Sequence, residues 1–359
     1  MSATIGTGYG IMPTVIANST MVRQQLDTLT EQASTGLVAQ TYAGLGGQSS
    51  VSLNLNPQIS ALQTYQTNIG QALGSMQVTQ TAMTQIQQVA STFVADIPNL
   101  NGLNASEVDS IASNARAALT QVAGLLDTTN GNSYVFGGQD TANPPVPAPD
   151  NILSSGFYTQ INTAVSSLST NGAAATIATT IAVGESNTSG TSSFSTYMSQ
   201  PGTALSTSQV QTGDGITVQT GLLASANVTA ISTGTSTTGS YMRDLMRTLA
   251  TLESLSSLQV NDPNFAALVR DTGTSLTGAV NAMATDVGVL GNSQASLTAT
   301  QSQLTTTATA FSGQVSSAQD VHMADTLSDL TAMQTQLQES YRLITTTNSL
   351  SLINFLRRP

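Results

Sequence analysis

Residues 59–86 read ISALQTYQTNIGQALGSMQVTQTAMTQI, and the spacing of their large apolar side chains decides the fold class. These side chains recur every seventh residue, and others fall three or four residues away on the same side of a helix. The two series, followed a little further along the chain, are Leu62, Ile69, Met76, Met83 and Ala90, and Ile59, Leu73, Ile86 and Phe93. A sustained seven-residue repeat is typical of a helix that packs along its length against another helix. Over residues 55–93 it predicts a helix roughly 58 Å long.

The C-terminal part of the chain carries the same pattern. Its seven-residue series is Leu290, Leu297, Leu304, Phe311 and Ala318. Shorter runs with apolar residues three and four apart predict further helices at 22–36, 105–128, 241–252 and 323–356. We therefore expect a mainly α fold in which long N- and C-terminal helices pair as an elongated, coiled-coil-like bundle.

The middle of the chain has a different composition. Residues 150–240 are poor in charge and rich in Ser, Thr and Gly. Residues 210–221 (VQTGDGITVQTG) alternate apolar and polar side chains around an Asp-Gly turn, which predicts a β-hairpin. We expect a small β-containing domain inserted between the helical segments. Because the segment 151–238 cuts no seven-residue series, its removal is expected to leave the helices folded.

The expected organisation has five parts. They are an N-terminal helical arm (1–45), the first part of a helical rod domain (46–145), the inserted Ser/Thr-rich outer domain (146–239), the second part of the rod domain (240–310) and a C-terminal helical arm (311–359). In the rod, one side of the helix at 105–128 carries Val108, Ile111, Ala115, Leu119, Val122 and Leu126. One side of the helix at 241–252 carries Met242, Leu245, Met246, Leu249 and Leu252.

Composition excludes several classes of function. The net charge is −11, only 8% of residues are charged, and all eight basic residues are Arg, so no cationic patch for nucleic acid is expected. The chain has no Cys and a single histidine, His322, which argues against thiol chemistry, a metal site or a catalytic triad. No apolar run is long enough to span a membrane, and the first 20 residues lack the pattern of a cleavable signal peptide. We expect no enzyme activity, no cofactor and no metal.

Three stretches of the helical ends carry a family resemblance. Residues 21–37 (MVRQQLDTLTEQASTGL), residues 59–86 quoted above and residues 323–356 (MADTLSDLTAMQTQLQESYRLITTTNSLSLINFL) resemble the terminal helices of the flagellin family. Within that family, residues 132–146 (NSYVFGGQDTANPPV) and 241–252 (YMRDLMRTLATL) are similar to segments of hook–filament junction proteins, the type called hook-associated protein 3.

The resemblance implies a structural subunit of the bacterial flagellum that assembles through its terminal helices. Its implied partners are copies of itself, other axial proteins such as hook-associated proteins and flagellin, and an export chaperone. It also implies an extracellular location reached through the flagellar type III pathway. The junction role and the role of filament flagellin both stay open, and a secreted adhesin or surface-binding protein is the alternative from another class. Gln87 and Gln88 stand where filament flagellins carry Arg and a nearby acid.

The apolar sides of the two terminal helices are the candidate assembly surface. An amphipathic helix needs a second surface to cover its apolar side, and the chain ends on the apolar stretch SLSLINFLRRP at 349–359. We expect neighbouring subunits to supply that surface. The candidate interface residues are Val22, Leu26, Leu29, Leu327, Leu330, Leu337, Tyr341, Ile344, Leu350, Leu352, Ile353, Phe355 and Leu356.

Overall fold

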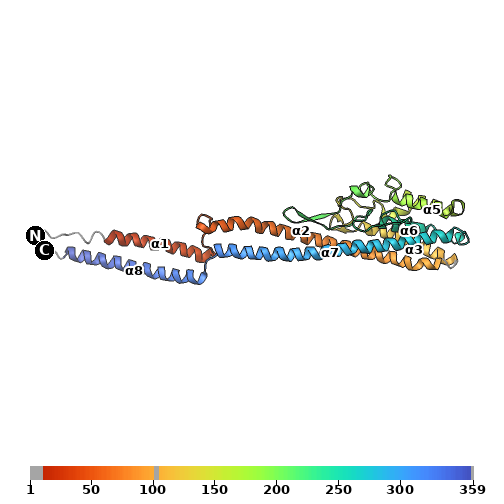
Figure 1. The fold of residues 1–359 in the computed structure, drawn as a ribbon. Helices are drawn as coiled ribbons and strands as arrows, with labels where there is room; N and C mark the ends of the chain where they lie inside the picture. Colours follow the sequence, from red (N-terminus) through yellow and green to blue (C-terminus); the bar gives the residue numbers. More distant parts are fainter. Residues whose placement is uncertain (1–10, 101–104, 357–359) are drawn as a thin grey trace. The chain divides into compact units, whose positions relative to one another are not determined.

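The computed structural model describes residues 11–100 and 105–356, with side chains over 14–100 and 105–346. The described part is mainly α-helical, as expected (Figure 1). Its contacts divide the chain into two compact units, the first formed by 1–62 with 306–359 and the second by 63–305. Both boundaries fall inside long helices. The five-part division expected from the sequence stays a prediction.

The elements of the described residues follow one another in this order. The helices are α1 (Ile11–Thr35), α2 (Ser49–Leu100), α3 (Ala105–Leu126), α4 (Gly156–Ser166), α5 (Leu168–Glu185), α6 (Tyr241–Glu253), α7 (Phe265–Gln319) and α8 (Met323–Leu356), with single turns of 3₁₀ helix at η1 (Gly46–Gln48), η3 (Gly202–Ala204) and η4 (Ser257–Gln259) and a longer one at η2 (Pro149–Ser154). The strands are β1 (Thr129–Asn130), β2 (Ser133–Tyr134), β3 (Gln209–Gly213) and β4 (Ile216–Gln219).

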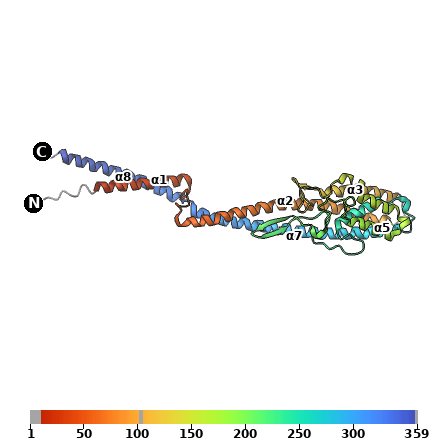
Figure 2. The same cartoon turned by 90° about the horizontal axis from the view of Figure 1, so that it is seen from above.

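In the first unit, α1 and α8 lie side by side and antiparallel (Figures 1 and 2). Gly36 ends α1 with a φ of +73°, a conformation that suits glycine, and its N–H donates to the carbonyl oxygen of Gln32. Just beyond, the N–H of Val38 donates to Gln319 O (2.7 Å) and the N–H of Val321 to Gly36 O (2.9 Å). These bonds tie the end of α1 to the turn that precedes α8.

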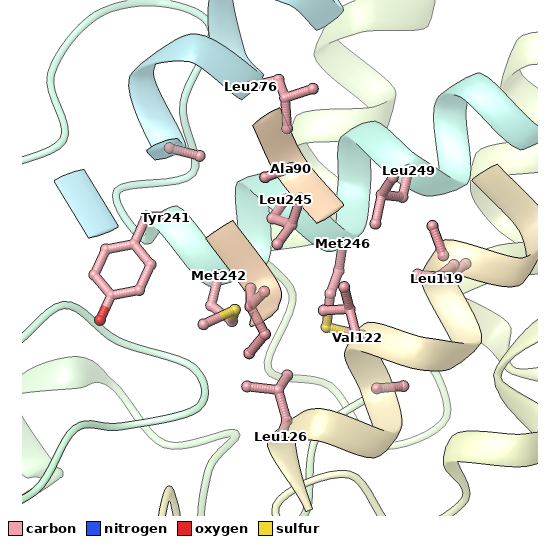
Figure 3. Packing of buried hydrophobic residues seen from close by; sticks show 14 of the residues in the cluster. Ala90, Leu119, Val122, Leu126, Tyr241, Met242, Leu245, Met246, Leu249 and Leu276 are labelled. Atoms are coloured by element: carbon pink, nitrogen blue, oxygen red, sulfur yellow. The ribbon is translucent and has the colours of Figure 1, made fainter. Parts of the chain in front are cut away.

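The second unit is built around α6, and Figure 3 shows its apolar side packed against α3. All thirteen residues of α6 are buried. The expected apolar side of α3 is confirmed, since every residue predicted for it is buried. Next to them, α2 and α7 run antiparallel, where Gln301 Nε2 donates to Gln66 O (3.3 Å) and Gly273 lies against Ile97. A side chain at Gly273 would come within 3.1 Å of Ile97.

The middle of the chain contains β structure, as expected. The predicted hairpin is confirmed: β3 pairs antiparallel with β4 around Asp214 and Gly215, and Gly215 has a φ of +68°. However, residues 156–185 form α4 and α5, which the sequence did not predict. Their many Ser, Thr, Gly and Ala residues obscure the helical period, and α5 is kinked at Gly172 (φ +77°). The buried side of α4 joins the core around α6, so the structure argues against removing 151–238 without harm.

Candidate assembly surface on the terminal helices

Each terminal helix buries one line of side chains against the other. On α1 this inner line is Val15, Ser19, Val22, Leu26, Leu29 and Ala33, and on α8 it is Thr326, Leu330, Met333, Leu337, Ser340 and Ile344. All of these side chains are buried or half-buried, and their spacing alternates between three and four residues. That spacing is the signature of two helices packed along a common line.

A second line of α8 stays exposed. It consists of Met323, Leu327, Gln334 and Tyr341, with Leu327 49% and Tyr341 41% exposed. A single partner helix covers only one side of another helix, and α8 is apolar over a wider arc than α1 can cover. The outer line of α8 (these four residues) is therefore a surface on which further apolar contact can be made.

Exposed apolar side chains are concentrated in the first unit. Among the described residues, thirteen large apolar side chains are exposed, and nine of them belong to this unit: Ile16, Met21, Val38, Tyr42, Leu53, Met323, Leu327, Tyr341 and Leu343. The second unit instead contains the whole apolar core cluster. Large exposed apolar surfaces mark sites of interaction with other molecules.

The predicted interface residues divide into three groups. Val22, Leu26, Leu29, Leu330, Leu337 and Ile344 lie on the inner lines between α1 and α8. Leu327 and Tyr341 lie on the outer line of α8. Leu350, Leu352, Ile353, Phe355 and Leu356 belong to the last turns of α8, whose side chains are outside the described residues. The sequence missed Thr326, Met333 and Ser340, because their polar or isolated side chains interrupt the apolar pattern.

A polar contact between Arg23 and Tyr341 joins the two helices. Arg23 of α1 donates a hydrogen bond to the hydroxyl of Tyr341, and its guanidinium lies 5.8 Å from the centre of the tyrosine ring. A cation over an aromatic ring at an exposed site contributes about 0.5–1 kcal/mol. This contact favours the observed alignment of α1 with α8.

The remaining charges of α8 are solvated. Asp325 lies 3.4 Å from His322, the residue just before the helix, and both side chains are 81% exposed. Arg342 and Glu339 form an exposed pair within the helix at 3.0 Å. Over residues 11–100 and 105–356 there is no group of three or more potential metal-binding side chains, and no helix long and apolar enough to cross a membrane.

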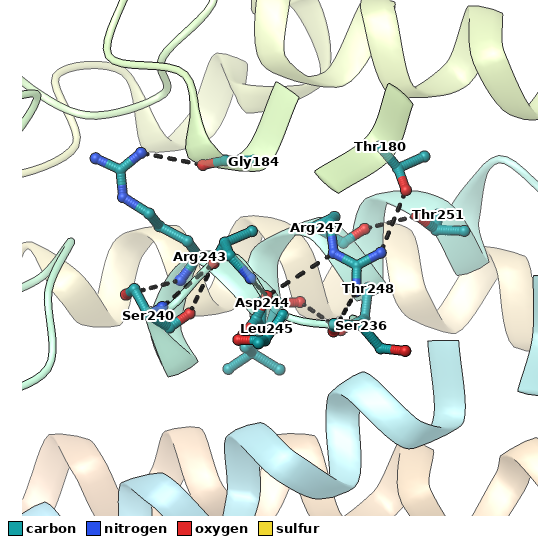
Figure 4. A network of polar contacts seen from close by, with 12 residues as sticks. Thr180, Gly184, Ser236, Ser240, Arg243, Asp244, Leu245, Arg247, Thr248 and Thr251 are labelled. Atoms are coloured by element: carbon teal, nitrogen blue, oxygen red, sulfur yellow. Dashed lines mark hydrogen bonds and ion pairs between the residues drawn. The ribbon is translucent and has the colours of Figure 1, made fainter. Parts of the chain in front are cut away.

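The second unit contains a buried polar network that the sequence did not reveal (Figure 4). Arg243 of α6 donates from Nε to Ser225 O (2.9 Å), from Nη1 to Gly184 O (3.0 Å) and from Nη2 to Asn187 Oδ1 (2.7 Å). Burial lowers the pKa of Arg243, although its donors are satisfied by neutral acceptors. The side chain thus connects α6 to the end of α5 and to the loop that precedes α6.

Arg247 and Asp244 extend this network one turn along α6. Arg247 donates to Thr180 Oγ1 and to Ser236 O, both at 3.2 Å, and lies 3.6 Å from Asp271. Burial lowers the pKa of Arg247 and raises the pKa of Asp244. The network fastens segments to one another and presents no nucleophile with a base. The helical period predicted only the apolar side of α6, since the partners of its polar side lie far away in sequence.

Asp286 of α7 holds residues 228–230, part of the loop that precedes α6. Asp286 is 1% exposed and accepts three consecutive backbone N–H groups, from Val228 (2.9 Å), Thr229 (2.9 Å) and Ala230 (2.7 Å). Charge-assisted bonds of this kind are about twice as strong as neutral ones. This part of the loop has no regular structure of its own, and these bonds hold residues 228–230 against α7.

Two family models match the helical ends of the chain. Residues 12–141 match the bacterial flagellin N-terminal helical region, and residues 274–356 match the bacterial flagellin C-terminal helical region. Together they cover more than half of the chain, and they contain α1 and α8 with their exposed apolar side chains. The chain belongs to the flagellin family. No curated protein matches it.

Membership of the flagellin family gives the exposed apolar side chains a context. The family supplies structural subunits that assemble into the polymers of the bacterial flagellum. The chain is therefore a flagellar structural subunit. Residues 142–273, which lie between the two matched regions, hold α4, α5 and α6 and the β3–β4 hairpin.

Proposed function

We propose that this subunit assembles through α1 and α8 and stands at the junction between hook and filament. The observation that carries the assembly route is the exposed outer line of α8. Fully burying a Leu side chain contributes about 1.5–3 kcal/mol, so the half that Leu327 still exposes corresponds to about 0.7–1.5 kcal/mol. A neighbouring helix laid against this line gains that energy at each apolar position.

The last turns of α8 add to the same surface. Residues 349–359 hold five large apolar residues: Leu350, Leu352, Ile353, Phe355 and Leu356. A helix end gains little from apolar residues unless a neighbour covers them. Deleting residues 349–359 should therefore leave a folded subunit that does not enter the flagellum. Its incorporation at the level of the intact chain would contradict the proposed route.

The junction role rests on residues 132–146 and 241–252, which are similar to segments of junction proteins. The first of these segments is a compact turn: Phe136 is buried, and a side chain at Gly138 would come within 2.7 Å of the carbonyl oxygen of Ser206. The second is α6, the centre of the second unit. The partners we propose are copies of the chain, other axial proteins and an export chaperone of the type III pathway.

Imaging of a deletion strain tests the junction role. Loss of a junction protein should leave hooks without filaments and should release flagellin into the medium, and the intact gene should restore the filaments. Hooks that carry full filaments after the deletion would rule the junction role out. Loss of the filament itself, with no flagellin in the medium, would instead assign the chain as filament flagellin.

An adhesin role is the alternative from another class, favoured by the Ser/Thr-rich composition of residues 150–240. The same deletion strain tests it. Normal swimming together with lost attachment to surfaces would favour an adhesin over either axial subunit.

A further inference from the structure

The β3–β4 hairpin has an exposed edge, at which backbone N–H and C=O groups of β4 point away from β3. The sheet contains only these two strands, so β4 pairs with β3 alone. The partners along the ladder are Gln209 with Gln219, Val210 with Val218, and Gln211 with Thr217. Val210 is buried, whereas the side chains of Thr217 and Gln219 are exposed. One side of the hairpin thus rests on the body of the unit, and β4 borders solvent.

The hydrogen-bond pattern tells which groups of β4 point outward. Thr220 N–H donates to Ser208 O at 2.9 Å, which makes these two residues a hydrogen-bonded pair. Such pairs alternate along an antiparallel ladder, so Val218 bonds to Val210 while Thr217 and Gln219 direct their N–H and C=O groups away from β3. By the same rule Gln209 and Gln211 direct theirs away from β4. The hairpin therefore offers an open edge on each strand.

The edge of β4 lacks the features that usually protect an exposed strand. Edge strands are commonly blocked by lysine, by proline or by a bulge. Residues 216–219 are Ile, Thr, Val and Gln, with no such feature. The irregularity of this hairpin lies on β3 between Gln211 and Gly213, so the regular open edge of β3 is the stretch Gln209–Gln211. Three of the four residues in β4 are β-branched, which favours strand pairing.

The scarcity of charge around the hairpin favours a second copy of the chain as the partner at this edge. The chain carries a net charge of −11, so two copies repel each other over most surfaces. Over residues 186–240, however, the only charged residue is Asp214. Like molecules meet here with the least repulsion, and a strand edge needs only the backbone of another strand as its complement.

We propose that β4 of one copy adds to β3 of the next copy in the assembled polymer. The two free edges of the hairpin are different, so the contact is head-to-tail and repeats from copy to copy. The proposal rests on the assembly role proposed above and adds a second contact, formed by the middle of the chain rather than by its terminal helices.

Hydrogen exchange on the assembled full-length chain tests this contact. The amides of Thr217 and Gln219 should exchange about tenfold more slowly, or slower still, in the polymer than in the monomer. The amide of Val218 is the internal control, because it is already bonded to β3 in the monomer. Polymers in which Thr217 and Gln219 exchange as in the monomer overturn the contact and leave assembly through the terminal helices intact.

A proline variant tests the same contact by function. Thr217→Pro removes an outward N–H and keeps the β3–β4 ladder, since proline is tolerated on an edge strand where its nitrogen faces solvent. It should lower the yield of polymer, while the monomer keeps the circular dichroism of the wild type. Polymer yield equal to that of the wild type overturns the proposal. So does protection that appears only after another axial protein is added. A wild-type chain that forms no polymer overturns the assembly role and this contact together.

Discussion

Replacing Leu327 by Ser should weaken assembly without unfolding the subunit. Leu327 is 49% exposed on the outer line of α8, so about half of the 1.5–3 kcal/mol available from burying a leucine remains to be gained in the polymer. Loss of about 0.7–1.5 kcal/mol per subunit should raise the critical concentration for polymerisation about three- to tenfold, because 1.4 kcal/mol corresponds to a factor of ten. Pelleting of polymer over a series of protein concentrations measures that shift.

Two leucines of the same chain serve as matched controls for this variant. Leu258 is 91% exposed in η4, outside the terminal helices, so Leu258→Ser should leave the critical concentration unchanged. Leu337 lies on the inner line, so Leu337→Ser should also reduce the helical content of the monomer. If Leu327→Ser and Leu258→Ser give the same critical concentration, the outer line of α8 is not an assembly contact.

Three further variants test the second unit. Asp286→Ala should cost about 3 kcal/mol in urea unfolding and should speed amide exchange at residues 228–230, because three backbone N–H groups lose their charged acceptor, whereas Asp214→Ala in the exposed turn should change neither. Burial raises the pKa of Asp127 to about 6, so the native state keeps this proton to a higher pH than the unfolded chain does. The free energy of unfolding of the wild type therefore decreases as the pH rises from about 4 to about 6. Asp127→Asn should remove this decrease, which is about 1–2 kcal/mol after allowance for the partial exposure of the side chain. If the urea midpoint changes equally with pH in the wild type and in the variant, Asp127 is not the group responsible. Excision of residues 151–238 should abolish cooperative unfolding of the second unit, and a sharp thermal transition in that variant would show that α6 does not need α4 and α5.

The helical spacing of apolar residues predicted the long helices correctly, because the residues on their apolar sides are the ones that the fold buries. Leu119 and Val122 of α3, like Met76 and Met83 of α2, are fully buried where the sequence places them on the apolar side. The sequence pattern predicted that α8 is a helix, but it did not predict which side of α8 packs against α1. Apolar residues occupy two neighbouring lines there, and the sequence contains no signal for which of them meets α1.

The polar half of the second unit could not be predicted in the same way. Arg243 and Asp244 look like the solvated side of an amphipathic helix. Arg243 is buried because it finds an acceptor far along the chain at Gly184, and Asp244 is buried because it accepts from Thr238 in the irregular segment just before α6. A helical period describes one helix and carries no information about such partners. The helices α4 and α5 were missed for a related reason: their Thr and Gly residues lower the contrast between the two sides of the helix.

The two units differ in which energetically costly groups they contain: the second unit buries charged side chains, and the first unit exposes apolar ones. The second unit buries charged side chains such as Arg247, and satisfies most of their polar groups internally, which gives a body that is complete as a monomer. The first unit leaves apolar side chains such as Leu327 exposed, which costs free energy until a neighbour covers them. By the assembly route proposed above, polymerisation draws its energy from the first unit, so it should depend steeply on the concentration of subunits, while the second unit should keep its fold in both states.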